Sequence, residues 1–492
     1  MAMGKRRAQQ QALWVAATEL PRSRGHVFYE PVNAMLMKEG FDAFAEKECL
    51  RFYKSETMGR PSMAPGVYFR MLLIGYFEGI DSERGIAWRC ADSRSLKSFL
   101  GYALTDETPD HTTVSRTRRL IDLETHGRVF TWILAVLAGK GLIDGKTIGV
   151  DATTLEANAA MRSIVRRDSG ESYSEFLKGL AKASGIETPT QEDLARMDRK
   201  RSKKTSNEDW EHPDDPDAKI AKMKDGSTHL AHKVEHAVDM QSGAVLALTL
   251  QGANVGDTTT IQETLVATAE QFEQLAANPE TAAQIRDNWL AEVVTDKGYH
   301  SNQTAVDLKV FGIRSYISEP KRGRRNWIGK PEERDAVYAN RRRIGRERGK
   351  ALMRRRGLML ERPFAHCYET GGMRRVHLRG HDNILKRLLI HVGGYNLSLM
   401  LRLTIGKGTP RGLQDLAILS FAAFILLRDA LCGNSRTLDT FSGHEEHLRV
   451  SERLGALIAG QFKNETSNTG CYDAGIEMVR ISTPNFLFWP PT

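Results

Sequence analysis

The sequence has few cysteines, no apolar run long enough to cross a membrane, and no apolar segment near its start. The five cysteines among 492 residues are odd in number, scattered, and free of C-x-x-C spacing. This pattern argues against a disulfide framework or a cysteine zinc site, and it is typical of reduced thiols in a cytosolic protein. The first residues, MAMGKRRAQQQALW, lack the apolar core of a signal peptide.

The longest apolar run is LAILSFAAFILL, residues 416–427. A membrane-spanning helix needs about 20 such residues, so we interpret this run as a helix of the protein core. We therefore expect no membrane partner and a cytoplasmic location.

Positive charge is concentrated in one segment of the chain. The whole chain carries 70 Lys and Arg against 61 Asp and Glu, a net charge of +9. The segment from Lys321 to Arg362 alone has 16 basic and 5 acidic residues, a net charge of +11. Such a dense basic segment is typical of a surface that binds nucleic-acid phosphates. The alternative is an arginine-rich solvated surface.

Residues 61–141 have the pattern of a helical domain, which follows a weakly patterned N-terminal extension, residues 1–60. VYFRMLLIGYFEGI is apolar, has the length of a helix, and closes at Gly79. Asp81 and Ser82 are cap candidates for the next segment, DSERGIAWRCADSRSLKSFLG, and Asp110 is the cap candidate for the stretch from HTTVSRTRRL onward. We predict a unit of short helices.

Three arginines of this unit suit a helix laid on DNA: Arg116, Arg118 and Arg119, beside Ser115. A solvated helix face explains the same charges, and the sequence leaves both readings open.

The pattern changes from helical to strand-like after Gly145. Candidate strands cover residues 146–155, 229–238, 243–250, 291–296 and 312–318, with helices at about 258–282 and 301–311. MQSG joins the second and third strands as a hairpin turn. We predict an α/β domain over residues 142–405, a mixed sheet with flanking helices. Charged insertions at 156–225 and 319–360 interrupt this domain, and a helical segment with a polar tail follows it at 406–492.

Three acids stand where acids are uncommon. Asp151 lies inside the strand pattern TIGVDATTLE, and Asp296 ends the apolar strand VVTD. An unpaired acid is costly to bury, so both positions call for a partner. Glu361 follows the basic segment at the start of ERPFAHCYETGG. Carboxylates that converge on a sheet are the hard oxygen ligands that Mg²⁺ or Mn²⁺ prefers.

Several stretches resemble bacterial insertion-sequence transposases of the DDE class that have a ribonuclease-H-like catalytic domain. They are VDATTLEANA, DGSTHLAHKVEHAVDMQSGAVLALTLQGANVGDT, VVTDKGYHS and ERPFAHCYETGGMRRVHLRGHDNILKRLLIH. PSMAPGVYFRMLLIGYFEGIDSERGIAWRCADSRSLKSFLG is similar to the helical N-terminal domain of such transposases. The resemblance covers roughly residues 60–405.

The resemblance implies that Asp151, Asp296 and Glu361 form a catalytic, metal-binding triad on two strands and a helix. It implies a metal-dependent DNA transposase that binds the terminal inverted repeats of its element, cleaves at the element ends and joins the 3′-hydroxyl to target DNA. The expected partner is double-stranded DNA, bound by a homodimer in the nucleoid. Two alternatives stay open: a nuclease without strand transfer, and a DNA-binding protein whose catalytic centre is idle.

The sequence departs from its relatives after Glu361. Many relatives carry a Lys one to two helical turns beyond this acid, whereas Tyr368 is the seventh residue on. The candidates to replace that Lys are Arg362, Arg374 and Arg375. Glu369 is the fallback for the third acid.

The residues expected to bind DNA are thus basic side chains of the helical domain and of the segment around the third acid. They are Arg116, Arg118, Arg119, Lys321, Arg322, Arg324, Arg325, Arg341, Arg342, Arg343, Arg354, Arg355, Arg356, Arg362, Arg374 and Arg375. Trp327 either packs this segment together or stacks on an unpaired base, and we favour packing.

Two further features have ordinary explanations. The histidines of THLAHKVEH have no Cys or acid at zinc spacing, so we expect hydrogen-bonded histidines there. Asp257 follows a strand and either caps the helix predicted at 258–282 or assists the triad.

Overall fold

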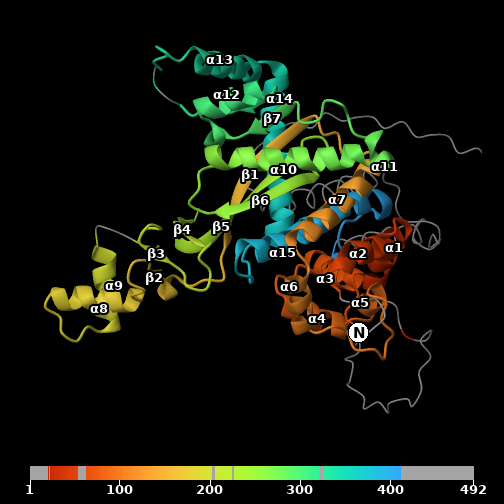
Figure 1. Ribbon diagram of the computed structural model, residues 1–492, viewed down its shortest axis with the longest axis horizontal. Helices are drawn as coiled ribbons and strands as arrows, with labels where there is room; N and C mark the ends of the chain where they lie inside the picture. The colour runs from red at the N-terminus through yellow and green to blue at the C-terminus, as the bar shows by residue number, and fades with distance from the viewer. Residues whose placement is uncertain are drawn as a thin grey trace, which may run out of the picture. The chain divides into compact units, whose positions relative to one another are not determined.

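The computed structural model describes residues 20, 23–53, 62–201, 205–223, 226–321, 323 and 325–411. They all fall within one compact unit, residues 1–417 (Figure 1). The helix predicted at 416–427, the tail that follows it, and Arg322 and Arg324 lie outside the described residues.

The N-terminal third is helical, as predicted. Its elements are α1 (Arg24–Lys38), α2 (Phe41–Cys49), the turn η2 (Leu50–Phe52), α3 (Pro65–Glu78), α4 (Glu83–Asp92), α5 (Arg94–Phe99), α6 (His111–Leu120) and α7 (Leu123–Gly139). The predicted caps act: Ser82 accepts the amide of Gly85 at 3.2 Å, and Asp110 accepts that of Thr113 at 2.8 Å. Gly79 ends α3 in the left-handed conformation with φ of 67°.

Two details differ from the expectation. The segment read as one helix breaks at Ser93, because its hydroxyl caps a new helix by accepting the amide of Leu96. Helices α1 and α2 occupy a region of weak pattern. They are stabilised by tertiary contacts such as the ion pair between Asp42 and Arg70, 2.7 Å long.

The sheet contains the five predicted strands and one more. They are β1 (Thr147–Glu156), β4 (Lys219–Lys222), β5 (Thr228–Asp239), β6 (Val245–Gly252), β7 (Glu292–Thr295) and β8 (Arg314–Ile317). The order is β4-β5-β1-β7-β8, with β6 also paired to β5. The pairings of β5 with β1, β4 and β6 are antiparallel, whereas β1, β7 and β8 are parallel. This is the predicted ribonuclease-H-like mixed sheet.

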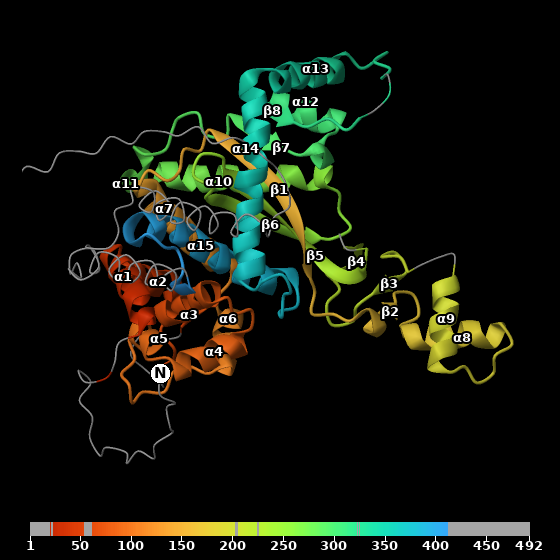
Figure 2. The same cartoon turned by 180° about the vertical axis from the view of Figure 1, so that it is seen from behind.

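Helices cover both faces of the sheet. One face carries α10 (Asp257–Ala277), which leads into α11 (Pro279–Ala282) (Figure 1). The other face is crossed by α14 (Glu347–Phe364), which continues into the π-helical turn η5 (Ala365–Thr370) (Figure 2). Along the chain, two helices lie between α11 and α14: α12 (Asn302–Val310) and α13 (Pro331–Gly345). Helix α12 precedes β8, and α13 packs on α12 and β8. Side chains alternate along β5, so Glu235 faces α10 while His236 faces η5.

The first insertion, which we expected to be an exposed loop with some helix, contains short helices and strands. It holds the turn η3 (Met161–Ser163), β2 (Val165–Arg166), α8 (Tyr173–Ala183), α9 (Gln191–Lys200) and β3 (Trp210–Glu211) before β4. Trp210 anchors a small core of its own, with Tyr173 and Phe176 edge-on to its ring. Strand β4 pairs with the start of β5 and so extends the sheet.

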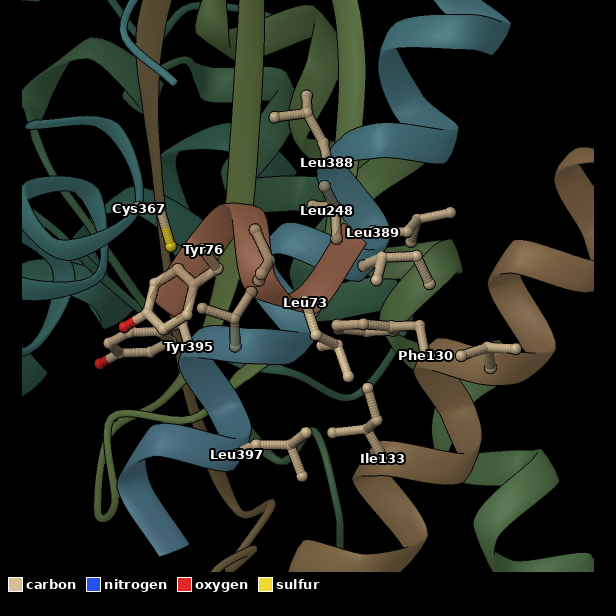
Figure 3. Close-up of a cluster of buried hydrophobic side chains, with 14 of the residues drawn as sticks. Leu73, Tyr76, Phe130, Ile133, Leu248, Cys367, Leu388, Leu389, Tyr395 and Leu397 are labelled. Atoms are coloured by element: carbon tan, nitrogen blue, oxygen red, sulfur yellow. The ribbon is translucent and has the colours of Figure 1, made fainter. Parts of the chain in front are cut away.

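Helix α15 (His381–Ile405) joins the sheet to the helical third. Gly393 and Gly394 allow this close approach, because a Cβ there would lie 2.6 Å from Ile133 and 2.9 Å from Tyr76. Figure 3 shows side chains of α3, α7, β6 and α15 meeting in one apolar core. By length and composition this helix could span a membrane, yet 78% of its apolar window is buried inside the protein, as in a core helix.

Candidate active site

Two neighbouring parallel strands bring Asp151 and Asp296 together. In the register of β1 and β7, Gly149 lies beside Val294. Asp151 stands two residues further along β1, and Asp296 stands two residues beyond Val294, directly after the end of β7. Continuing the strand alternation from this register places both aspartates at the same level and on the same face. This is the face that α14 crosses (Figure 2).

The carboxylate of Asp151 has few hydrogen-bond partners among the described residues. Its Oδ1 accepts the amide of Ala152 at 2.9 Å, and its Oδ2 lies 3.3 Å from Nη1 of Arg356 on α14. Burial raises the pKa of Asp151 to about 6. The negative charges of Asp296 and Asp257 also raise this pKa, whereas the hydrogen bond from the Ala152 amide and the positive charge of Arg356 lower it. Negative charge is therefore crowded here, in a way that a bound cation would relieve.

Asp296 begins the turn η4 (Lys297–Tyr299), and its Oδ1 accepts the amide of Gly298 at 2.7 Å. Glycine is required at 298 because of crowding. A Cβ on this residue would lie 2.6 Å from Oδ2 of Asp257 and 3.0 Å from Oδ1 of Asp296. The turn thus holds two carboxylates around one backbone position.

Glu361 lies on α14, directly after Leu360, whose side chain packs over the position of Gly149. The Glu361 side chain is exposed. Within the described residues, no three His, Cys, Asp or Glu side chains are placed to hold a metal ion together, so the triad is not assembled. The fallback acid, Glu369, is occupied by an ion pair with Arg374.

The donor chemistry of the two aspartates fits a small divalent cation. Mg²⁺ is commonly bound by one or two carboxylates together with phosphate oxygens of the substrate. Asp151 and Asp296 supply such a pair on rigid strands, with the positive charge of Arg356 beside them.

Beneath the aspartates lies a buried network that sequence reasoning missed. Glu235 accepts hydrogen bonds from Thr260 at 2.8 Å, from Tyr299 at 2.7 Å and from Thr264. Burial raises the pKa of this carboxyl. The signal was available, because Glu235 interrupts the apolar strand pattern of VEHAV just as Asp151 interrupts its own strand.

The histidines of β5 do separate tasks. His232 lies 3.3 Å from Asp215, and both side chains are fully buried. His236 lies 2.6 Å from the hydroxyl of Tyr368, and burial lowers the pKa of His236 to about 3. His229 is 3.9 Å from Glu156.

The arginines of α6 divide between surface and interior. Arg116 and Arg119 are exposed, but Arg118 is buried and pairs with Glu83 at 2.7 Å. It also donates to Asn383 of α15 at 2.5 Å. Arg118 thus fastens α6 to α4 and α15, and its expected place on a DNA-facing surface is wrong in this structure.

The basic segment, Lys321 to Arg362, likewise contains arginines that bind to other parts of the protein and arginines that are exposed. Arg325 and Arg341 pair with Glu319, and Arg343 donates to Ser315. Arg355 donates to the carbonyl of Gln241, and Arg356 donates to Asp151. Arg374 pairs with Glu369 and donates to Thr153, and Arg375 lies 3.7 Å from Glu156.

Other basic residues of the segment are exposed and make no such contact with the described residues. Lys321 is exposed, as are Arg342, Arg354 and Arg362, and no side-chain hydrogen bond or ion pair is found for any of the four within the described part of the chain. Trp327 is half-buried, with Arg325 over its ring at 5.6 Å, as the packing interpretation expects.

The candidate site is not the large hollow of this fold. A hollow of about 630 Å³ lies along α10 and α12, lined mainly by apolar side chains such as Leu265, Leu308 and Phe311. The two aspartates are not part of its lining. An open, charged site suits an extended polyanion better than a small apolar molecule.

Two family models match the chain. Residues 20–120 match a transposase domain (DUF772), and residues 207–397 match the transposase DDE domain. Asp296 and Glu361 lie inside the second match, whereas Asp151 lies between the two. No curated protein matches the chain. The two matches together span more than half of the sequence, and with the fold they show that the chain belongs to the insertion-sequence transposases of the DDE class.

Proposed function

We propose that this transposase cuts DNA at the inverted-repeat ends of its element and joins the freed 3′-hydroxyl ends to target DNA. Asp151, Asp296 and Glu361 are its catalytic carboxylates. The observation that carries the proposal is the register of the parallel strands β1 and β7, which brings Asp151, in β1, beside the end of β7, where Asp296 follows.

In this proposal Asp151 and Asp296 hold Mg²⁺ or Mn²⁺ from the sheet, and Glu361 approaches from α14. Two such ions, when bound, activate the attacking oxygen and stabilise the leaving oxygen of a phosphodiester. Arg356 holds Asp151 from the helix side at 3.3 Å and places positive charge where a phosphate approaches. The rigid strands keep the two aspartates in place through both cleavage and joining.

DNA is bound in the proposal by exposed basic side chains, which face solvent and can neutralise phosphates. Arg116 and Arg119 of α6 contact the terminal repeats, while Arg342, Arg354 and Arg362 track the backbone near the aspartates. Two copies of the chain act on the two element ends.

The test is an assay of the full-length protein on a labelled duplex that carries the flanking genomic repeats, with Mg²⁺ or Mn²⁺ and a target plasmid. We expect cuts at the repeat ends and labelled products joined to the plasmid. Free ends without joined products would replace the proposal with a nuclease. DNA binding without any cut would replace it with an idle DNA-binding protein.

A further inference from the structure

Asp257 is the first residue of α10, and a buried lysine holds it. Its Oδ1 lies 2.6 Å from Nζ of Lys233, whose side chain is 6% exposed. The same Nζ donates to the carbonyl of Val255 at 3.2 Å and to the hydroxyl of Thr260 at 3.0 Å. All three donors of the ammonium group are therefore used, and the Asp257 carboxylate is fixed in one orientation.

The other carboxylate oxygen of Asp257, Oδ2, lies close to Asp296. Oδ2 of Asp257 and Oδ1 of Asp296 both lie within 3.0 Å of the position that a Cβ of Gly298 would take. The carboxylates of Asp257 and Asp296 thus lie beside one another just after the end of β7, one from α10 and one from the turn η4.

Capping does not explain this arrangement. Gly256 is the N-cap of α10, and the Asp257 side chain is turned to Lys233 instead of to the free amides of the first turn. An acid that only complements the helix dipole needs neither a buried lysine nor a neighbouring carboxylate, because such acids act from the solvent side.

We propose that Asp257, positioned by Lys233, is a further carboxylate of the divalent-cation site and faces the cation from the α10 side of the sheet. The inference rests on the proposed function, since it assigns a further residue to the same site. Lys233 is a positioning residue: it holds Asp257 and touches neither DNA nor cation.

The test measures binding of Mn²⁺ alone by titration calorimetry on the full-length protein without DNA. We expect Asp257→Asn to weaken Mn²⁺ binding by about tenfold or more, the size seen when supporting groups of a metal site are lost. Glu270→Gln removes an exposed acid of the same helix and is the matched control, with unchanged Mn²⁺ affinity. Wild-type affinity in Asp257→Asn would overturn the inference.

Asp151→Asn, measured in parallel, separates this inference from the proposed function. If Asp151→Asn loses Mn²⁺ binding while Asp257→Asn keeps it, only the role of Asp257 fails. If Asp151→Asn also binds Mn²⁺ as the wild type does, the proposed active site itself fails.

A purely structural pair of Lys233 and Asp257 predicts another result. The melting temperature of metal-free Asp257→Asn would fall while its Mn²⁺ affinity stayed unchanged, and this result contradicts the inference. If Asp257→Asn does not fold, Asp257→Glu takes its place, because it keeps the charge beside Lys233 and shifts the carboxylate by one methylene. We expect weaker Mn²⁺ binding there too, and unchanged affinity would overturn the inference.

Discussion

The two faces of the sheet treat their polar groups differently. On the α10 face, Glu235 is fully buried and receives hydrogen bonds from Thr260, Thr264 and Tyr299. On the α14 face, the Asp151 side chain is 21% exposed, and among the described residues its carboxylate accepts from one amide and one arginine. A satisfied buried network stabilises a fold, whereas partly satisfied carboxylates at a surface are available for a ligand. We therefore assign Glu235 to the scaffold that stabilises the fold and Asp151 to the candidate active site.

On the α14 face, a large effect on cleavage should distinguish the two candidate third acids. Glu361→Gln should reduce DNA cleavage by about 100-fold or more, as expected when a group of a metal site is lost. Glu369→Gln should stay within about twofold of wild type, because Glu369 pairs with Arg374 on the protein surface. Initial cleavage rates on a labelled repeat duplex measure both, and the reverse ranking would make Glu369 the third acid.

On the α10 face the expected effect is on stability. Glu235→Ala leaves two threonine hydroxyls and the Tyr299 hydroxyl without their acceptor, at a cost of about 3 kcal/mol in the free energy of unfolding. Asp151→Asn should change the same free energy by less than about 1 kcal/mol. Urea unfolding of the metal-free protein measures both. Equal losses would erase the distinction between the two faces.

A buried histidine of α15, His391, makes the stability of the protein sensitive to acid. Burial, with the charge of Arg387, lowers the pKa of His391 to about 3, and its Nε2 lies 2.8 Å from the carbonyl of Cys367. Above the ordinary pKa of 6.5, folded and unfolded chains are both neutral here. Below it the unfolded chain takes up a proton first, so stability falls as pH drops from 6.5 toward 3.

His391→Gln keeps a donor for that carbonyl and removes the titration. Between pH 7 and pH 5 the wild type should lose about 2 kcal/mol more unfolding free energy than the variant. Urea unfolding at the two pH values gives the difference. An identical loss in both proteins would show that His391 does not titrate as described.

The smallest effects concern the arginines. Alanine at exposed Arg342, Arg354 or Arg362 should each weaken DNA binding modestly and reduce the salt dependence of log K by about 0.9 per lost phosphate contact. Arg341→Ala is the contrasting variant. It removes an ion pair to Glu319, so it should lower stability more than it changes the salt slope. Fluorescence anisotropy at several salt concentrations measures the slopes.

Local pattern predicted the parts of the fold that local chemistry decides. The alternation of side chains predicted five strands, and cap residues predicted the starts of α4 and α6. Acids inside or at the end of apolar strand patterns predicted that Asp151 and Asp296 lie close together. The register between β1 and β7 agrees with that placement. The third acid, Glu361, stays a prediction.

What the sequence could not give depends on partners far along the chain. Arg118 looks like its neighbours in sequence, and only Glu83 and Asn383 draw it inside. Strand β4 exists because β5 offers a free edge to a short, charged segment. Glu235 and Lys233 interrupt the apolar pattern of β5, and this pattern does indicate polar side chains with buried partners.

The measurement that tests the central claim most directly compares wild type with Asp151→Asn and Asp296→Asn, in cleavage and in binding of the same repeat duplex. We expect both variants to lose cleavage by at least about 1,000-fold while their DNA affinity stays within a few-fold of wild type. Cleavage that persists in either variant would contradict the account, because the aspartate pair would then not carry the chemistry.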